Sequence, residues 1–469
     1  MLRVAVIGSG PSGVYTAQAL VEQRAVPGIE VYVLDRLPCP YGLVRYGVAP
    51  DHEKIKSLQN NLRTVLEHPR VHFLGNVDVG APGLGPRELR RAFHAVVYCV
   101  GAATDRRLGI PGEDLPGSCS ATDFVSWYSA HPDAPAGRFA LTARSAVVIG
   151  VGNVAVDVAR VLAREAAELA GTDVPQTALG TFADSRVRDI WMVGRRGPSQ
   201  AKFTTKELRE LGSLPHAEVC VRPEELALDP AYGDPGGLPA VNRRNVEVLR
   251  GWAERPAPQE PDRPGTDRPG TGRPGTDLVR RIHLRFFLRP AEILGDAESG
   301  VRGVRFERTA PDGWGGVRGT GRYEDIAGEL VLRSVGYRGT PQEGLPFDQE
   351  GGTVPHLEGR VLRDGVPSPG EYVAGWIKRG PTGVIGTNRP CAKQTAASLL
   401  ADAGAGALDE EPPAQDPVTV LRQAGQRPVP WRGWLGIEAA EAALGRELGR
   451  TVVKIPDWDG LLAAARTTG

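Results

Sequence analysis

Two glycine-rich turns constrain the fold of this chain more than any other feature of its sequence. The first lies in the segment VAVIGSGPSG, residues 4–13, where Gly8, Gly10 and Gly13 form the pattern G-x-G-x-x-G after an apolar run. In such turns the first glycine allows a tight bend, the second lets a pyrophosphate approach the backbone, and the third lets a helix pack closely on a strand. The segment therefore predicts a strand, a turn and a helix that bind a dinucleotide.

The residues after the first turn support this interpretation. Pro11 and Ser12 begin the expected helix, whose free N–H groups and partial positive charge favour a phosphate. The next apolar run, EVYVLD, ends in Asp35, at the offset where an acidic side chain accepts hydrogen bonds from ribose hydroxyls. Because an acid at this place opposes a 2′-phosphate, NAD or FAD fits the first turn.

The second turn has the pattern G-x-G-x-x-A and opens another apolar helix. Its residues are Gly150, Gly152, Asn153, Val154 and Ala155. The strand expected next, VRDIWMVGRR, ends in Arg195 and Arg196 instead of an acid. Two guanidinium groups at this place suit the 2′-phosphate of NADP, whereas two basic residues alone would indicate a solvated turn.

Three later segments favour FAD as the ligand of the first turn. Residues 95–102 (AVVYCVGA) and 330–337 (LVLRSVGY) read as strands that end at a glycine. Strands of this kind occur in two-dinucleotide flavoproteins, at the places where the chain crosses between the two nucleotide-binding domains. Residues 371–388 (EYVAGWIKRGPTGVIGTN) read as a strand, a glycine-dense turn and a helix start, which can lay N–H groups along a flavin ring or a pyrophosphate. One turn would hold a resident flavin and the other a visiting NADPH.

Length and composition limit the class of protein. The 469 residues suit two to three domains, and the balance of 56 basic and 56 acidic residues indicates neither nucleic acid nor a membrane surface as a partner. No apolar run reaches the roughly 18 residues of a membrane helix. The first expected strand starts at Leu2, which leaves no room for a signal peptide, so we expect a cytoplasmic protein.

The cysteines indicate no metal or thiol redox centre. They form no C-x-x-C pair and have no histidine at zinc spacing; they are Cys39, Cys99, Cys119, Cys220 and Cys391. We therefore expect no metal ligands in this chain and no disulfide relay.

The segment 256–277 repeats the unit R-P-G-T-x three times and has almost no apolar side chain. Such a segment cannot offset the entropy of ordering, so we expect a disordered surface insertion. We expect a helix before it in VEVLRGWA and one alternating strand after it in RRIHLRFFLRPAEIL. Residues 301–309 (VRGVRFERT) then form the next strand of a hairpin.

These features together resemble the adrenodoxin-reductase-type ferredoxin–NADP reductases of bacteria and mitochondria. The most specific match is residues 37–56, LPCPYGLVRYGVAPDHEKIK, and further matches are GNVAVDVARVL, GRRGPSQAKFTTKELREL and GWIKRGPTGVIGTN. The resemblance implies an α/β protein with two Rossmann-like dinucleotide-binding domains, like glutathione reductase without its interface domain. Residues 1–106 and 332–469 would form the FAD-binding domain, and residues 107–331 the NADP-binding domain.

The resemblance also implies site residues. For FAD these are the first glycine turn, Asp35, Leu43, Val77, Trp376, Gly383, Val384 and Ile385. For NADP they are Gly152, Asn153, Val154, Arg195, Arg196, Glu207 and Gly383. His52 and Glu210 resemble residues near the contact of flavin and nicotinamide, where they would orient the nicotinamide and tune proton access. The alternative is that His52 only begins a helix, with Asp51 beside it as a plausible N-cap.

The implied activity is hydride transfer from NADPH to FAD, followed by single-electron transfer to an acidic iron–sulfur protein such as a ferredoxin. Candidate docking residues for that partner are Lys202, Lys206, Arg209, Arg243 and Arg244, although a solvated basic surface would look the same. Other possibilities are a flavin subunit of a larger enzyme, an NADPH-dependent flavin monooxygenase or quinone reductase, and a flavin redox sensor without turnover.

Overall fold

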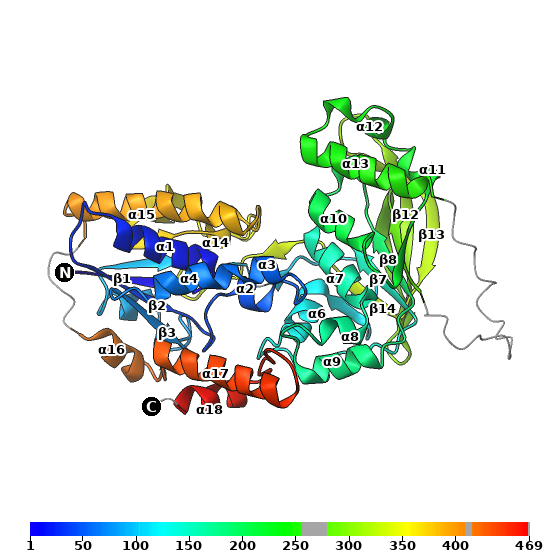
Figure 1. The fold of residues 1–469 in the computed structure, drawn as a ribbon. Helices are drawn as coiled ribbons and strands as arrows, with labels where there is room; N and C mark the ends of the chain where they lie inside the picture. Colours follow the sequence, from blue (N-terminus) through cyan, green and yellow to red (C-terminus); the bar gives the residue numbers. More distant parts are fainter. Residues whose placement is uncertain (103, 256–278, 409–414, 468–469) are drawn as a thin grey trace.

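The computed structural model describes residues 1–102, 104–255, 279–408 and 415–467, and has two lobes that lie side by side (Figure 1). Each lobe contains a sheet of mainly parallel strands with helices packed against it. The repeat segment 256–277 lies outside the described residues. No helix in the described part of the chain is long and apolar enough to cross a membrane.

The first lobe is built on an eight-stranded sheet in the order β16-β17-β18-β4-β1-β2-β3-β19. Strands β18, β4, β1, β2 and β3 are parallel, and the other three pair antiparallel at the edges. Because β18 pairs directly with β4, this sheet joins the two ends of the chain. The strands are β1 (Leu2–Ile7), β2 (Ile29–Leu34), β3 (Val71–Gly75), β4 (Ala95–Tyr98), β16 (His356–Leu357), β17 (Arg360–Arg363), β18 (Val366–Val373) and β19 (Val429–Pro430).

Helices cover both faces of this sheet. Helix α1 (Pro11–Glu22) packs beside α15 (Asn388–Gly404). Helix α1 turns an apolar face to the core, because Val14, Ala17 and Leu20 are fully buried. The remaining helices of this lobe are α2 (Leu43–Tyr46), α3 (Glu53–Lys56), α4 (Leu58–Leu66), α5 (Pro86–Leu89), α14 (Trp376–Arg379), η3 (Ile385–Thr387), α16 (Pro417–Gln423), α17 (Trp431–Glu447) and α18 (Trp458–Arg466).

The second lobe is built on a six-stranded sheet in the order β6-β14-β7-β8-β10-β9, in which all neighbours are parallel. Its strands are β6 (Ser118–Ser120), β7 (Ser145–Ile149), β8 (Asp189–Val193), β9 (Ala217–Val221), β10 (Arg280–Arg285) and β14 (Leu330–Arg333). Its helices are α6 (Ala121–Tyr128), α7 (Asn153–Ala163), α8 (Ala166–Leu169), α9 (Gln176–Ala183), η1 (Pro198–Gln200), α10 (Thr205–Leu211), α11 (Pro223–Leu226), α12 (Pro230–Gly233), η2 (Pro235–Gly237) and α13 (Ala240–Ala253). The α/β fold class that the resemblance implies is confirmed.

A three-stranded antiparallel sheet packs on the second lobe and corrects one expectation. It contains β11 (Leu288–Asp296), β12 (Gly300–Pro311) and β13 (Val317–Ala327). The single strand predicted for RRIHLRFFLRPAEIL is wrong: β10 and β11 belong to different sheets, because Phe287 has a φ of 57° and turns the chain between them. The hairpin of β11 with the segment 301–309 is confirmed, as is the helix before the repeat segment.

Three contacts lie where the lobes meet. A short antiparallel pair links β5 (Thr104–Asp105) to β15 (Tyr337–Arg338), where the chain crosses between the lobes. The carboxyl-terminal segment supplies Lys454, which is buried and lies 3.0 Å from Asp173 of the second lobe. Asp173 also accepts a hydrogen bond from Lys56 of the first lobe at 2.7 Å. Burial lowers the pKa of Lys454 to about 7, although Asp173 opposes that shift.

Candidate functional site

The first glycine turn is packed so closely that two of its glycines have no room for a side chain. A Cβ atom on Gly8, whose φ is +106°, would lie 2.5 Å from the carbonyl oxygen of Cys99. A Cβ atom on Gly13 would lie 1.8 Å from the carbonyl oxygen of Gly8. Gly10 differs, because its nearest neighbour would be the Cα atom of Gly42 at 3.8 Å. The protein itself therefore requires Gly8 and Gly13, whereas Gly10 leaves space at the start of α1.

Asp35 lies directly after β2 and is tied to the first turn. One carboxylate oxygen accepts hydrogen bonds from the backbone N–H and the hydroxyl of Ser9, at 2.7 and 2.6 Å. The other oxygen accepts from the N–H of Leu37 at 2.9 Å. Burial raises the pKa of Asp35, and these hydrogen bonds oppose the shift. Because a carboxylate has about four acceptor positions, one remains for a further donor such as a ribose hydroxyl.

The segment 371–388 reaches the first turn from the other end of the chain. A Cβ atom on Gly375, whose φ is +80°, would lie 2.4 Å from the hydroxyl oxygen of Ser12. Trp376 begins α14, and its ring centroid lies 5.4 Å from that of Tyr337. Its buried Nε1 has no hydrogen-bond acceptor among the described residues. The segment thus brings close to the first turn an indole ring, tilted by 32° against Tyr337, and its unused N–H donor.

The other residues predicted to bind FAD differ in their exposure to solvent. Leu43 is exposed at the start of α2. Val77 is buried, and its N–H donates to the carbonyl oxygen of Asp35 at 2.9 Å. Gly383 and Val384 are exposed and Ile385 is half-buried, in the glycine-dense turn before α15. Val77 is thus tied to Asp35, and Gly42 beside Leu43 and Gly375 beside Trp376 approach the first turn.

The second glycine turn repeats this geometry at the end of β7. A Cβ atom on Gly150, whose φ is +145°, would lie 2.2 Å from the carbonyl oxygen of Ser334, whereas Gly152 has no neighbour within 4 Å. Asn153 begins α7, and its side-chain oxygen accepts a hydrogen bond from the N–H of Thr204 at 2.8 Å. This bond connects the turn to α10, which is a role that the sequence did not predict for Asn153. Val154 is half-buried in the first turn of α7.

Arg195 and Arg196 follow the end of β8, next to the second turn in the parallel sheet. Their backbone carbonyl oxygens accept hydrogen bonds from the Thr309 hydroxyl at 2.9 Å and the Phe287 N–H at 3.3 Å. Arg195 is exposed and Arg196 is half-buried. In the part of the chain that the structure describes, neither guanidinium group forms an ion pair, so the loop is fixed while both charges remain available.

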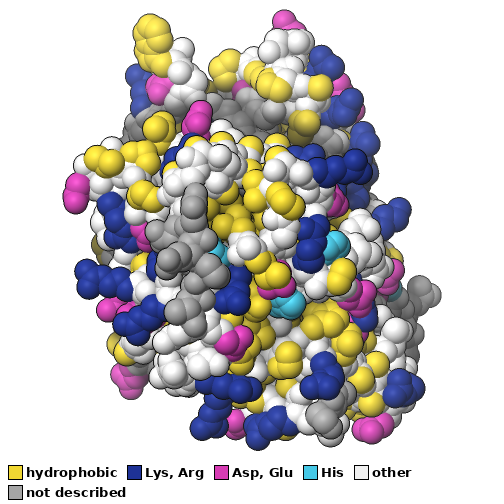
Figure 2. Space-filling view, turned by 90° about the vertical axis from the view of Figure 1, so that its left-hand side faces the viewer, with side chains coloured by type: hydrophobic (Ala, Val, Ile, Leu, Met, Phe, Trp, Pro, Cys, Tyr) yellow, Lys and Arg dark blue, Asp and Glu magenta, His cyan; other side chains and the backbone are white. Residues whose placement is uncertain are grey.

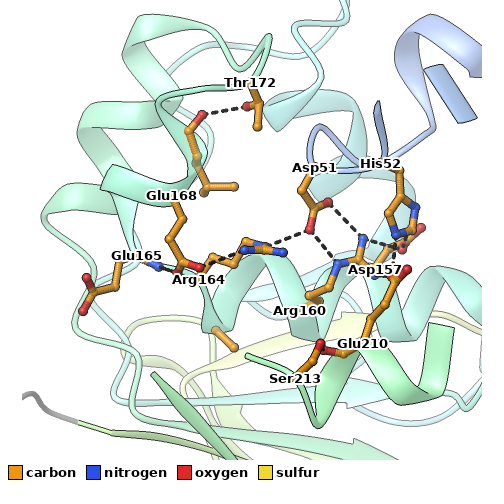
Figure 3. A network of polar contacts seen from close by, with 12 residues as sticks. Asp51, His52, Asp157, Arg160, Arg164, Glu165, Glu168, Thr172, Glu210 and Ser213 are labelled. Carbon is orange, nitrogen blue, oxygen red and sulfur yellow. Dashed lines mark hydrogen bonds and ion pairs between the residues drawn. The ribbon is translucent and has the colours of Figure 1, made fainter. Parts of the chain in front are cut away.

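The structure brings His52 and Glu210 together across the two lobes (Figure 3). Nε2 of the buried His52 lies 2.7 Å from Oε2 of Glu210 and 3.2 Å from Oε2 of Glu207. Nδ1 of His52 lies 3.8 Å from Oδ1 of Asp157. His52 belongs to the first lobe, Glu207 and Glu210 to α10, and Asp157 to α7, so this cluster joins the two lobes.

Sequence analysis missed three members of this cluster, which are Asp51, Asp157 and Arg160. Asp51 accepts hydrogen bonds from Nε and Nη2 of Arg160 at 2.7 and 2.9 Å, and from Nε of Arg164 at 2.8 Å. The interpretation of Asp51 as an N-cap is wrong, because His52 is the N-cap residue of α3 and makes no capping bond with its side chain. An arginine and an aspartate within the otherwise apolar helix GNVAVDVARVL were the available signal.

Burial and neighbouring charges raise the pKa values of two carboxyl groups in this cluster and leave those of two others lowered. Burial raises the pKa of Asp157 to about 6, although Arg160 opposes the shift. Burial and the nearby Asp157 raise the pKa of Glu207 to about 7. Burial also acts on Asp51, but the hydrogen bonds from Arg160 outweigh it and lower its pKa to about 2. In the same way, the bond to His52 outweighs burial and lowers the pKa of Glu210.

The same cluster offers ligand atoms of His52, Glu207 and Glu210 that all lie within 4.8 Å of one another. Its charge environment differs from that of a cation site, because Nη1 of Arg160 lies 3.3 Å from Oε2 of Glu210. A buried arginine already neutralises these carboxylates, so we assign the cluster no metal.

An open pocket of about 680 Å³ lies beside this cluster, between α10 and α13. Its lining residues are Thr205, Lys206, Arg209, Glu210, Ser213, Arg244 and Glu247. Three of the candidate docking residues therefore line one pocket, while Lys202 is exposed on the segment before α10 and Arg243 is half-buried on α13. On the face shown in Figure 2, by contrast, basic and acidic side chains are mixed.

Comparisons with known proteins agree with this geometry. Residues 2–192 match the family model "Pyridine nucleotide-disulphide oxidoreductase". The chain is 43% identical to NADPH-ferredoxin reductase FprA of Mycobacterium tuberculosis, over 98% of both chains. It is 38% identical to the mitochondrial NADPH:adrenodoxin oxidoreductase of Arabidopsis thaliana, over 99% of this chain and 95% of that one.

Among solved structures, FprA from Mycobacterium tuberculosis in complex with NADPH matches with a TM-score of 0.89 and 41% sequence identity, and 99% of each chain is covered. Similarity at this level extends through both lobes and both glycine turns. The chain therefore belongs to the adrenodoxin-reductase-type family of ferredoxin–NADP reductases.

Proposed function

We propose that this chain is an FAD-dependent ferredoxin–NADP(+) reductase, which takes a hydride from NADPH and delivers single electrons to a ferredoxin-type iron–sulfur protein. The observation that carries the proposal is the contact of His52 with Glu210 at 2.7 Å, because it joins the lobe with the first glycine turn to the lobe with the second. The names of the relatives, which contain NADPH together with ferredoxin or adrenodoxin, support the same activity. Bound FAD supplies the chemistry that accepts two electrons and releases them singly.

The first lobe would hold FAD. The space left at Gly10 and the N–H groups at the start of α1 suit a pyrophosphate, and Asp35 has an acceptor position left for a ribose hydroxyl. The unused Nε1 of Trp376 suits a carbonyl or ring nitrogen of a flavin. Contacts would come from Gly8, Gly10, Pro11, Ser12, Gly13, Asp35, Leu43, Val77, Trp376, Gly383, Val384 and Ile385.

The second lobe would hold NADPH. Gly150 and Gly152 with the start of α7 would bind its pyrophosphate, and Arg195 and Arg196 would bind its 2′-phosphate. Asn153, Val154, Glu207 and Gly383 complete the proposed set. We accordingly propose residues 1–106 and 332–469 as the FAD-binding domain and 107–331 as the NADP-binding domain, with the last boundary inside β14.

His52 and Glu210 would orient the nicotinamide and control proton access at the shared site. Replacing His52 with alanine is expected to lower the rate of flavin reduction by NADPH about tenfold to a hundredfold, since small losses of alignment are costly in transfer reactions. Stopped-flow loss of the visible flavin absorbance measures this rate. If NADPH oxidation and cofactor affinity are both unchanged in the variant, His52 has neither role.

The proposed function is tested with the purified protein as it is. We expect a yellow protein with a flavin spectrum, which NADPH bleaches much faster than NADH, and which then reduces an added ferredoxin catalytically. The acceptor rate should fall with rising salt if Lys206, Arg209 and Arg244 steer an acidic partner. A colourless protein that takes up no FAD would refute the proposal.

Other outcomes of this experiment point to the alternatives. Oxygen uptake coupled to hydroxylation of an organic substrate would indicate a monooxygenase, and quinone reduction in preference to ferredoxin would indicate a quinone reductase. Flavin reduction without catalytic transfer to any acceptor would indicate a redox sensor. We also propose a cytoplasmic location for the protein.

A further inference from the structure

We propose that Arg160 is a positioning residue for hydride transfer. It holds the side chains of His52 and Glu210 in contact with each other across the two lobes (Figure 3). This inference rests on the proposed function. The Arg160 side chain is 1% exposed and comes from α7, the helix that begins at the second glycine turn. It therefore connects the NADP-binding turn to the residues that approach from the first lobe.

Arg160 fixes the backbone next to His52 through a two-point contact. Its Nε and Nη2 atoms donate to the two oxygens of Asp51, at 2.7 and 2.9 Å. Asp51 directly precedes His52 in the sequence. A planar, two-point arginine–carboxylate pair determines orientation as well as distance, so this pair sets how the His52 segment meets α7.

Arg160 also acts on the partner of His52. Its Nη1 lies 3.3 Å from Oε2 of Glu210 and 3.6 Å from Oε2 of Glu207, and its Nη2 lies 2.9 Å from Oδ1 of Asp157. All of its side-chain polar contacts with described residues are to carboxylates of this cluster. Without the cation these buried carboxylates would repel one another, and the 2.7 Å contact between His52 and Glu210 would lengthen.

Arg164 provides a matched control on the same helix end. It donates to Asp51 at 2.8 Å and to Glu168 at 2.8 Å, but makes no contact with His52, Glu207 or Glu210. Replacing Arg164 removes one positive charge beside Asp51 and leaves the surroundings of Glu210 unchanged. Replacing Arg160 removes a contact with both residues, so the two variants separate these effects.

The variants Arg160→Lys and Arg160→Gln test the inference in the flavin-loaded protein. We expect flavin content and NADP(+) affinity to stay within about threefold of the unmodified protein. The rate of flavin reduction should fall roughly tenfold to a hundredfold, as for a misplacement of about 1 Å. Lysine should restore little of the rate because it lacks the planar fork. Arg164→Gln should change the rate by no more than about twofold.

The pH dependence of flavin reduction gives a second readout, which a loss of stability alone would not change. The titratable and charged groups around Arg160 are Asp51, His52, Tyr128, Asp157, Arg164, Lys206, Glu207 and Glu210. Removing the arginine charge raises the pKa values of Asp157 and Glu207 further. We expect the rate of flavin reduction to fall at low pH as these carboxylates take up protons. The pH at which the rate is half its maximum should therefore be higher in Arg160→Gln and unchanged in Arg164→Gln.

The inference is overturned if Arg160→Lys keeps both the rate and the pH midpoint, or if Arg164→Gln has effects as large as those of Arg160→Gln. Should Arg160→Gln fail to fold, Arg160→Lys decides alone. Failure of the proposed function is recognised separately, because the unmodified protein would then show no reduction of flavin by NADPH.

Discussion

Replacing Arg195 and Arg196 together by glutamine is expected to weaken NADPH binding several hundredfold or more while leaving NADH binding almost unchanged. Each charged hydrogen bond to a phosphate contributes about 1.5–3 kcal/mol, and about 1.4 kcal/mol corresponds to a factor of ten. Both guanidinium groups lie at the end of β8 and form no ion pair within the described residues. Titration of each nucleotide against the flavin-loaded protein measures the two dissociation constants.

A double variant at the other end of the same strand controls for the change in net charge. Arg186 and Arg188 lie just before β8, which starts at Asp189, so their replacement by glutamine should leave the preference for NADPH intact. Equal losses of affinity for NADPH and NADH in the Arg195 and Arg196 variant would disprove a contact with the 2′-phosphate.

Alanine at Gly10 and alanine at Gly13 should fail in different ways. At Gly13 the new Cβ atom would lie 1.8 Å from the Gly8 carbonyl oxygen, so this variant should lose stability by about 1–3 kcal/mol or more. At Gly10 the Cβ atom meets only Gly42, at 3.8 Å, so the variant should fold normally. It should nevertheless bind FAD about fivefold to a hundredfold more weakly, because the methyl group occupies the approach of the pyrophosphate.

Thermal unfolding and the visible spectrum separate these two effects. Gly152→Ala is the matched control, because Gly152 is the open glycine of the second turn; it should keep its flavin and weaken only NADPH. Full flavin content in Gly10→Ala would show that no pyrophosphate lies over this turn.

Local sequence patterns predicted those parts of the fold that are determined by residues close together in the sequence. The glycine turns, the acid at Asp35 and the basic pair after β8 follow from spacing, and the structure places each at a strand end. Alternating apolar residues could not reveal that Phe287 turns the chain between two sheets, because its φ of 57° leaves the pattern of RRIHLRFFLRPAEIL unchanged.

The charge cluster shows a second limit of the sequence. The proximity of His52 and Glu210 was expected from the resemblance, but the pairing of Asp51 with Arg160 was not. Those two residues are far apart in the sequence, and both belong to segments that read locally as a helix start and an apolar helix. Their contact arises only when the two lobes meet.

The pairing of β4 with β18 has a consequence for the order in which the lobes form during synthesis. Tyr98 leaves the ribosome long before Val366, and at about 5–20 residues per second the interval is on the order of ten to fifty seconds. Throughout this time β4 can pair with β1, but its opposite edge, which later pairs with β18, has no neighbouring strand, while all strands of the six-stranded sheet emerge. The lobe in the middle of the chain can therefore mature first, and the nascent amino-terminal portion is the part that a chaperone has most reason to shield.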